Sequence, residues 1–380
     1  MKFIAEALGV SQAVIEKLNE KNLIRLAFIK HPFFRDVIEA YKLERKVGEF
    51  EPGTLIAKTV EGLRVVRGYP KIKRALTLYP TIKKHFKGEV VLEEKMNGYN
   101  VRLVKFGENI YAITRGGFIC PYTTEKARRL VNLDFFKDNP KLMLCCEAVG
   151  EESPFVPKDV YGVKTIDFYV FDIRDQKTNI ALPIKQKEKL AEEYGLKLAP
   201  ILAEVQVSKA HEIAKEIILE LDKRGREGIV IKDPMMRRPP IKYTTSQCNC
   251  SDLSYAFRFF EEYGKDFMFS RIIREAFQSF EFRENEEKFK DRCLRLGEAI
   301  LSMVKSIKEV NEGKRIVEKM RLRFYDLEIF ELFKEHIRRM GIRAEFSNPK
   351  REEDGYVVWV YRHIMSTTDK IKYILAGNLY

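Results

Sequence analysis

Residues 90–102 read VVLEEKMNGYNVR, which is an apolar run, a lysine, an Asn-Gly pair and a second apolar run. Asn-Gly between two such runs is the strongest short hairpin signal, so we predict a strand, a two-residue turn and a return strand. Because strand side chains alternate between faces, Glu93 and Lys95 share one face and Glu94 takes the other. A lysine at a strand end beside a glycine can meet a phosphate group, although solvated lysines on surface hairpins are far more common.

The composition is that of a globular protein larger than one ordinary domain. The chain has 380 residues, of which 45% are hydrophobic, and this length predicts roughly two to four domains. It contains no apolar run long enough for a membrane span. The first residues have the pattern of an amphipathic helix with acidic positions rather than of a signal peptide, so we expect a cytoplasmic protein.

The chain is strongly basic, with a net charge of +13 and 33% charged residues. This charge favours a polyanionic partner, and nucleic acid ranks above a membrane because no basic amphipathic helix stands apart. A Lys-, Arg- and Glu-rich surface of the thermophile type explains the charge equally well. The six cysteines do not form a disulfide framework, because Cys145 and Cys146 are adjacent and Cys248 and Cys250 are separated by one residue. The five histidines are scattered, so we expect reduced, mostly buried thiols and no zinc site.

Residues 64–88 mix basic and aromatic side chains. Such a mixture suits a phosphate backbone with stacked bases, and a solvated helix face with a few core aromatics explains it equally well. The residues concerned are Arg64, Arg67, Lys71, Lys73, Arg74, Lys83, Lys84 and Lys87, interleaved with Tyr69, Tyr79 and Phe86.

Changes of pattern divide the chain into four predicted domains. Residues 1–63 form a small N-terminal α+β domain, with helices near 11–30 and 32–46 and a strand pair over 54–68. Residues 64–247 form the central domain. Its short strands are separated by few helices, which predicts an α+β fold with antiparallel sheets. Its predicted strands are 89–95, 100–106, 109–114, 142–149, 166–173, 200–207 and 228–232, and its predicted helices are 123–131, 184–194 and 209–224.

The C-terminal third is mostly helical at first. Segments 252–280 and 283–311, within the predicted domain 248–312, have apolar residues at helical spacing. Their apolar faces look wider than one small domain can cover, which predicts a symmetric homodimer through these helices. A small α+β domain, 313–380, follows, with predicted helices near 325–340 and 366–376 and strands at 342–347 and 355–361.

Five further stretches place polar or aromatic residues at or near strand ends, in an order that permits a single pocket. They are TRGG at 114–117, CEAVG at 146–150, DFYVFDI at 167–173, REGIVIK at 226–232 and IKY at 241–243. Together with Lys95-Met96-Asn97-Gly98, which fits K-x-[D/N/H]-G, this ordered set resembles the covalent nucleotidyltransferase superfamily of ATP-dependent ligases and capping enzymes. The motifs cover roughly 90–245. The whole chain is similar to the archaeal homodimeric ATP-dependent RNA ligases.

The resemblance implies an antiparallel-sheet nucleotidyltransferase domain, an ATP-grasp-like ligase core. It also implies ATP and Mg²⁺, with Mn²⁺ as an alternative, and RNA with 5′-phosphate and 3′-hydroxyl ends. Lys95 would become linked to AMP, which then passes to the RNA 5′-phosphate before the 3′-hydroxyl displaces it. A lysine attacks only as a neutral amine, and its ordinary pKa is about 10.4. We therefore expect burial, Lys242 and a magnesium ion to lower the pKa of Lys95.

The resemblance also assigns roles to residues. Lys95, Glu227 and Lys242 would be catalytic, and Glu147 and Glu227 would hold the metal, with orientation of the lysine as an alternative for Glu227. Glu93 would accept a hydrogen bond from adenine N6, Phe171 would stack on the adenine, and Arg115 and Glu147 would bind the ribose and the adjoining phosphate. Lys242 would contact the α-phosphate. The remaining predicted nucleotide-binding residues are Glu94, Asn97, Gly98 and Asn100.

Two positions depart from the family pattern. The last motif usually carries two lysines in K-x-K, but Lys242 is followed by Tyr243-Thr244. Either Thr244 or Lys232 fills this role, although strand parity places Lys232 on the face opposite to Glu227. Asn100 stands where DNA ligases often have arginine, which favours RNA as the substrate.

Other functions remain open at this point. A DNA nick ligase or a capping guanylyltransferase usually carries a small five-stranded barrel after the last motif, and residues 252–311 offer nothing of that kind. A catalytically inactive RNA-binding protein would bind RNA in a salt-sensitive way without forming a covalent intermediate.

Overall fold

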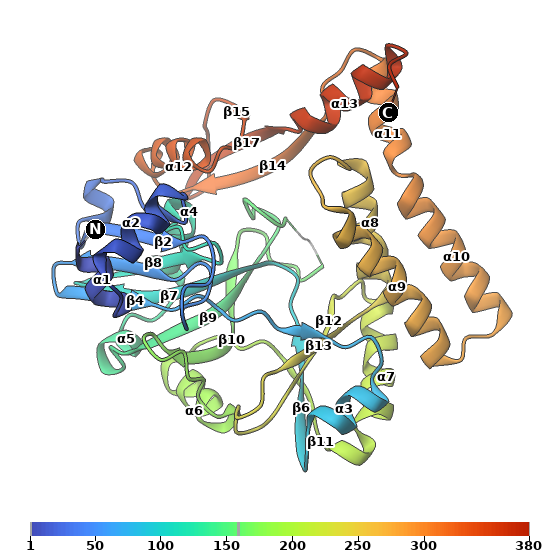
Figure 1. Ribbon diagram of the computed structural model, residues 1–380, viewed down its shortest axis with the longest axis horizontal. Coiled ribbons are helices and arrows are strands. Elements are labelled where there is room, and N and C mark those ends of the chain that lie inside the picture. The colour runs from blue at the N-terminus through green and yellow to red at the C-terminus, as the bar shows by residue number, and fades with distance from the viewer. Residues whose placement is uncertain (1, 158–159, 380) are drawn as a thin grey trace.

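The computed structural model describes residues 2–157 and 160–379, and its fold is α+β, as predicted. The strands of this described part form four sheets with mostly antiparallel pairing. Figure 1 shows the N-terminal elements at one end of the molecule and a group of long helices at the other, with the C-terminal sheet crossing between them. No helix in the described ranges is long and apolar enough to cross a membrane.

The N-terminal sheet has the order β1-β2-β3-β4. One face packs on α1 and α2, and the other packs on the sheet that contains β7. The elements are α1 (Lys2–Leu8), α2 (Gln12–Glu20), β1 (Ile24–Leu26), a 3-10 turn (Pro32–Phe34), β2 (Val37–Leu43), β3 (Leu55–Thr59) and β4 (Gly62–Val66).

The prediction of two long helices in residues 1–63 is wrong. The helix expected over 11–30 ends at Glu20, and residues 37–43 of the helix expected over 32–46 form a strand. β2 pairs with β1 on one side and with β3 on the other, so backbone hydrogen bonds to both neighbours outweigh the local helical pattern.

The sheet that we call the β7 sheet has the order β10-β9-β7-β8. Its core extends beyond the central domain, because side chains of this sheet and of α4 pack against the C-terminal sheet and α12. The elements are β7 (Tyr99–Phe106), β8 (Asn109–Thr114), α4 (Pro121–Leu130), α5 (Asp134–Asp138), β9 (Leu142–Val149) and β10 (Asp167–Asp175).

The β6 sheet has the order β11-β6-β12-β13-β5, in which only the β13–β5 pair is parallel. α3 and α7 cover one of its faces. Its strands are β5 (Lys73–Arg74), β6 (Glu89–Lys95), β11 (Ile201–Gln206), β12 (Gly228–Lys232) and β13 (Ile241–Thr244), and the helices are α3 (Tyr79–His85), α6 (Ile184–Tyr194) and α7 (Val207–Lys223).

The predicted Asn-Gly hairpin is also wrong, because β6 and β7 belong to different sheets. Neither Asn97 nor Gly98 has the positive φ that a tight hairpin turn requires. Gly98 serves a close approach instead, since a Cβ there would lie 2.2 Å from the Ala148 carbonyl oxygen. The link therefore carries the chain from one sheet to the other, and Lys95 lies where they meet.

The helical region contains four helices in place of the two predicted at 252–280 and 283–311. They are α8 (Ser246–Arg258), α9 (Lys265–Phe282), α10 (Glu286–Leu301) and α11 (Met303–Asn311). The first predicted helix is interrupted before Gly264, the N-cap of α9, and the second is divided at Ser302.

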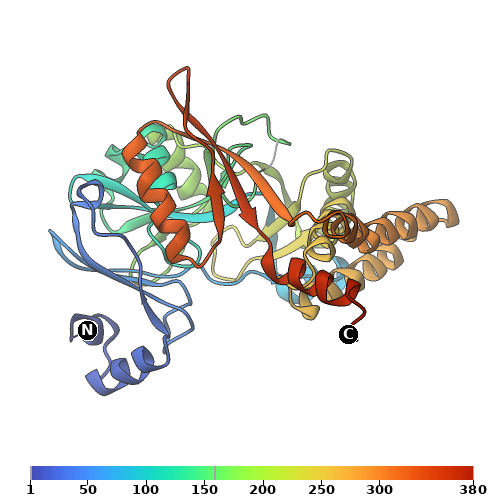
Figure 2. The same cartoon turned by 90° about the horizontal axis from the view of Figure 1, so that it is seen from above.

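The C-terminal segment runs back from these helices toward the N-terminal end of the molecule (Figures 1 and 2). The predicted helices near 325–340 and 366–376 and the strands at 342–347 and 355–361 are all present, whereas β14 and β16 were not predicted. The elements are β14 (Val317–Phe324), α12 (Leu327–Arg339), β15 (Ala344–Phe346), β16 (Lys350–Glu352), β17 (Gly355–His363) and α13 (Met365–Leu375). The hydrophobic core of the β7 sheet is continuous with those of the N-terminal sheet and of the C-terminal sheet. Packing therefore does not separate the four predicted domains, and their boundaries stay predictions.

One buried arginine joins the N-terminal sheet to the β7 sheet. Arg102 on β7 donates hydrogen bonds to the carbonyl oxygens of Arg67 (2.6 Å), Gly53 (2.9 Å) and Thr114 (2.8 Å). Its side chain is fully buried, and burial lowers its pKa to about 10.

We expect Arg102→Met to lower the free energy of unfolding by about 3 kcal/mol or more, because buried carbonyl oxygens would lose their donors. Urea denaturation measures this change. The exposed Arg45→Met is the matched control and should stay within about 0.5 kcal/mol of wild type. Equal stability of the two variants would contradict a joining role for Arg102.

Candidate active site

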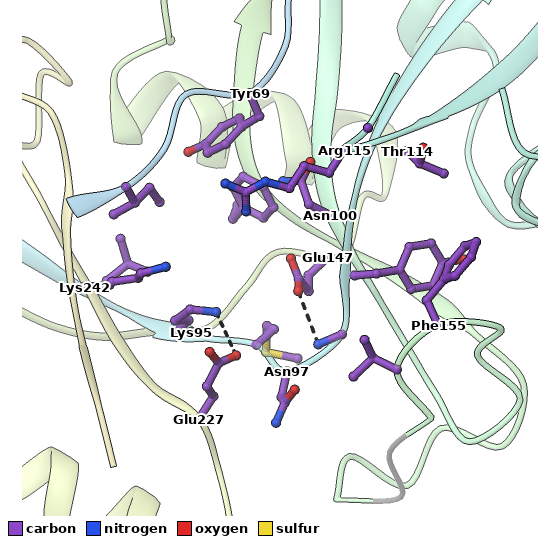
Figure 3. Close-up of a pocket in the computed structure, with 18 of the residues that line it drawn as sticks. Tyr69, Lys95, Asn97, Asn100, Thr114, Arg115, Glu147, Phe155, Glu227 and Lys242 are labelled. Atoms are coloured by element: carbon purple, nitrogen blue, oxygen red, sulfur yellow. Dashed lines mark hydrogen bonds and ion pairs between the residues drawn. The ribbon is translucent and has the colours of Figure 1, made fainter. Parts of the chain in front are cut away.

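A cavity of about 780 Å³ lies between the β6 and β7 sheets and reaches the N-terminal sheet and α9. Every predicted site residue lines it, and Figure 3 shows seven of them converging with Tyr69, Thr114 and Phe155. The predicted residues are Glu93, Glu94, Lys95, Asn97, Gly98, Asn100, Arg115, Glu147, Phe171, Glu227 and Lys242. Residues far apart in the sequence are thus brought together as the motif order predicted, while their roles stay predictions.

Lys95 lies at the end of β6 and forms an ion pair with Glu227, at 2.7 Å between Nζ and Oε2. Its side chain is only 19% exposed. Burial would lower the pKa of Lys95, but the negative charges of Glu227 and Glu147 outweigh burial and raise it. The predicted lowering is therefore wrong for the protein without ligands, because two carboxylates dominate the field at this amine.

Glu147 lies near the end of β9, on the opposite wall of the cavity. Its Oε1 accepts a hydrogen bond from the backbone nitrogen of Gly98 at 3.2 Å. Burial raises the pKa of Glu147 to about 7, assisted by the charge of Glu227 and opposed by the charge of Lys95. A carboxyl group with this pKa exchanges protons readily near neutral pH.

Lys242 on β13 is a second lysine with a shifted pKa. Burial lowers its pKa to about 7, and the neighbouring charges of Arg74 and Lys95 act in the same direction. Of these two lysines, Lys95 therefore carries a proton at neutral pH, whereas Lys242 gains or loses its proton near that pH.

Glu227 and Lys232 both face the cavity, so the parity prediction that separated them is wrong. Gly228, between Glu227 and the rest of β12, has φ +147°, and a Cβ there would lie 2.2 Å from the Tyr243 carbonyl oxygen. Side-chain alternation does not continue through this position. Glu227 is thereby placed beside Lys95.

A buried ion network forms the wall of the cavity next to Glu93. The two carboxylate oxygens of Glu93 bind Nζ of Lys187 and Nζ of Lys232, each at 2.5 Å. Lys232 also binds Asp172 at 3.0 Å, and this network holds the pKa of Asp172 near 2 despite its burial. Lys187 and Asp172 were not predicted as site residues. Asp172 follows Phe171 in the quoted stretch 167–173, whereas no pattern around Lys187 indicates that α6 packs against the strands of the site.

Aromatic rings lie beside this network. Phe171 contacts Tyr69 edge to face at 5.1 Å between ring centroids, and the Tyr69 hydroxyl donates to Asp172 at 2.7 Å. Met96 packs into the same small apolar cluster as Phe171. Tyr69 was not predicted as a site residue, although it belongs to the basic and aromatic stretch 64–88.

The other predicted residues occupy the rim and the link between the sheets. The backbone nitrogen of Arg115 donates to the carbonyl oxygen of Asn100 at 3.1 Å, and the exposed Arg115 side chain points into the cavity. The backbone nitrogen of Asn97 donates to the Tyr161 hydroxyl at 2.7 Å. Glu94 lines the cavity too, but its carboxylate pairs with Arg226 at 3.2 Å.

Glu147 and Glu227 are the carboxylates available to a divalent cation beside Lys95. No group of three or more His, Cys, Asp or Glu side chains in residues 2–157 and 160–379 could hold a metal ion. Mg²⁺ commonly uses one or two carboxylates and completes its shell with water and substrate phosphates. The donor set therefore fits Mg²⁺ brought together with a phosphorylated substrate.

Comparison with known proteins agrees with this geometry. Residues 88–244 match the RNA ligase family model, and residues 255–378 match the model described as the ligase Pab1020 C-terminal region. An uncharacterised protein of Methanocaldococcus jannaschii is 42% identical, covering 99% of this chain and 96% of the other.

Solved structures show the same similarity over the whole chain. Two structures of an archaeal ATP-dependent RNA ligase, forms 1 and 2, are each 36% identical with a TM-score of 0.91, covering 100% of this chain and 99% of theirs. A provisionally assigned ATP-dependent DNA ligase from Aquifex aeolicus is 25% identical with a TM-score of 0.87, covering 97% of this chain and 100% of its own.

We expect Glu227→Gln to make the Lys95 amine reactive at lower pH, because loss of the adjacent negative charge lowers the pKa of this lysine. The pH at half-maximal modification of Lys95 by an amine reagent, followed by mass spectrometry, should fall by about one pH unit. Glu94→Gln, whose carboxylate pairs with Arg226, is the control and should leave this pH unchanged. An unchanged pH for Glu227→Gln would show that the ion pair does not govern Lys95.

Proposed function

This chain belongs to the archaeal ATP-dependent RNA ligases, and from that premise we propose that Lys95 carries AMP as it joins RNA ends. The predicted family and enzyme class are confirmed, and the enzyme is an AMP-forming ligase. The observation that carries the lysyl-AMP proposal is the position of Lys95, whose amine faces the cavity 2.7 Å from Glu227.

In the proposed first step, Lys95 Nζ attacks the α-phosphorus of ATP. A nitrogen–phosphorus bond forms, the bond from the α-phosphorus to the β-phosphate oxygen breaks, and pyrophosphate leaves with the electron pair. The amine must first lose its proton. Glu227 is within hydrogen-bonding distance to accept it, and Glu147, with a pKa of about 7, can pass a proton onward.

In the second step an oxygen of the RNA 5′-phosphate attacks the same phosphorus, and the amine of Lys95 leaves and regains a proton. The 3′-hydroxyl of the other end then attacks the activated 5′-phosphate, and AMP departs. Negative charge shifts among phosphate oxygens in every step, so positioned cations contribute most of the catalysis. We assign Lys242 to the α-phosphate and Arg115 to the ribose and adjoining phosphate. A bound phosphate would favour the protonated form of Lys242.

We assign the nucleotide base to the wall formed by Phe171 and Tyr69. A flat apolar surface beside polar groups suits a purine ring. Glu93 remains the proposed acceptor for adenine N6, although both of its carboxylate oxygens already bind lysines. Glu94, Asn97, Gly98 and Asn100 complete the proposed site around the nucleotide.

We also assign a divalent cation, Mg²⁺ or Mn²⁺, to Glu147 and Glu227. When bound, the ion would neutralise phosphate charge and offset the carboxylates that raise the pKa of Lys95. With the ion held by Glu147 and Glu227, this offset would favour the neutral form of the Lys95 amine. We further propose a cytoplasmic enzyme, since ATP and RNA are both found there.

The homodimer stays part of the proposal. α9 and α10 leave large apolar side chains in solvent, with Phe280 81% exposed. The others on these two helices are Phe269, Phe277, Phe289, Leu294 and Leu301. A second copy of the chain would remove this surface from water.

Incubation with Mg²⁺ and ATP labelled in the α-phosphate should attach labelled AMP to the wild-type protein, and Lys95→Ala should reduce this labelling at least about 1,000-fold because the nucleophile is lost. Gel electrophoresis of the denatured protein measures the label. Lys87→Ala, on the exposed surface, should label like wild type. An unlabelled wild type, or a labelled Lys95→Ala, would disprove the lysyl-AMP proposal.

The same preparation can test the substrate. We expect joining of 5′-phosphorylated single-stranded RNA to exceed joining of a nick in duplex DNA, and ATP to be preferred over GTP. Faster sealing of the DNA nick would favour the activity named for the Aquifex aeolicus protein.

Sedimentation at micromolar concentration should give twice the mass of one chain. Phe280→Glu should shift the protein toward monomers, because burying a carboxylate in an apolar interface is costly. Ile180→Glu, which changes another exposed apolar residue away from α9 and α10, should remain a dimer. A monomeric wild type would refute the proposal.

A further inference from the structure

Three arginines lie near Lys242, between β13 and α9, with one of them on the wall of the cavity and the other two in the layer behind that wall. Arg74 comes from β5, where it pairs with Lys242 across the parallel strands. Arg271 and Arg274 lie one turn apart on α9, and Arg271 lines the cavity. The helical region therefore contributes positive charge to a site that the sequence motifs alone place between the two sheets.

Short polar contacts hold this arginine cluster (Arg74, Arg271 and Arg274) in place. Arg74 donates to the Thr244 hydroxyl at 2.8 Å, and that hydroxyl contacts Asn249 Oδ1 at 3.2 Å. Arg274 donates to the same Asn249 oxygen at 2.7 Å. Arg74 and Arg274 are thus linked through two neutral side chains.

The cluster has an excess of positive charge. Arg271 pairs with Asp252 at 2.6 Å, whereas no carboxylate of the described residues lies within 4.0 Å of a guanidinium nitrogen of Arg74 or Arg274. Arg274 is only 7% exposed. Burial, together with the charges of Arg74 and Arg271, lowers the pKa of Arg274 to about 9. The negative charge of Asp252 opposes this lowering only in part, and a bound anion would stabilise the buried cation further.

The strand register places the cluster across from Lys95. Lys95 pairs with Gly228, and Gly228 pairs with Thr244 on the next strand. Paired residues share a face, and Gly228 places no side chain between Lys95 and Thr244. Two strand spacings separate their backbones by roughly 10 Å, which leaves room for phosphate groups between the amine and Arg74.

If both nucleotidyl-transfer steps proceed by in-line displacement, the same phosphate-binding position is used in each of them. When Lys95 attacks the α-phosphorus, the pyrophosphate leaves from the side opposite the amine. When the RNA 5′-phosphate attacks lysyl-AMP, its oxygen must enter opposite the same amine, which then leaves. The departing and the entering phosphates therefore need cations at the same place.

We propose that Arg74, Arg271 and Arg274, together with Thr244, form a phosphate subsite that holds the β- and γ-phosphates of ATP and then the RNA 5′-phosphate. This inference rests on the lysyl-AMP chemistry proposed above. It also accounts for the missing second lysine of the last motif. Thr244 occupies the site face at that position, and the cation comes from Arg74 on the neighbouring strand.

The test uses full-length protein that carries labelled AMP. Two rates are measured, namely release of the label as ATP when pyrophosphate is added, and transfer of the label to 5′-phosphorylated RNA. Arg74→Gln and Arg274→Gln should each slow both reactions by about tenfold or more, with a parallel rise in the KM for pyrophosphate and for RNA. Arg283→Gln, at the exposed end of α9, should match wild type.

Arg74→Lys and Arg274→Lys are the controls that keep the positive charge. Thermal unfolding of every variant is compared with wild type, so that a loss of activity caused by misfolding is detected. The lysine variants should retain more of both reactions than the glutamine variants. Loss of only one reaction, or of neither, would overturn the shared subsite. Failure of wild type to accept label would instead overturn the lysyl-AMP proposal, so the two failures are distinguishable.

Discussion

The ion pair between Lys95 and Glu227 is the interaction on which the site depends. It holds the amine at the meeting point of the two sheets and keeps it charged in the absence of ligands. A permanently neutral lysine in this position would leave the half-buried Glu227 carboxylate without its ion-pair partner. In the proposed mechanism the amine would become a nucleophile only when the substrate and its cation change this balance, so its reactivity would be coupled to binding.

Glycines make this arrangement possible. Gly98 lets β7 approach the backbone of β9, and Gly228 lets Glu227 turn toward Lys95 past the backbone of β13. A side chain at either position would push apart the strands that define the cavity. The charged groups lie in separate places, with the Glu93 network beside Phe171, the carboxylates at the amine and the arginine cluster near Lys242.

Much of the site could be predicted from the sequence. The six motifs supplied residues that all line one cavity, because most of the motifs place their chemical group at or near the end of a strand, where neighbouring elements of the fold converge. Tyr69, Lys187 and the arginine cluster could not be predicted in this way. They reach the site from α6, α9 and the segment before β6, and no local spacing shows that those elements fold against the motif strands. Asp172 lies within the motif stretch on β10 but was not chosen as a site residue.

The sequence by itself determined the family, the α+β class and a set of motif residues that line one cavity, since these depend on residue types at short separations. Only the tertiary structure decided that β6 and β7 part into two sheets, that residues 37–43 form a strand, and that Lys232 faces the cavity. It also decided the protonation of Lys95. Strand partners and electric fields come from residues distant in the chain, and local pattern does not encode their positions.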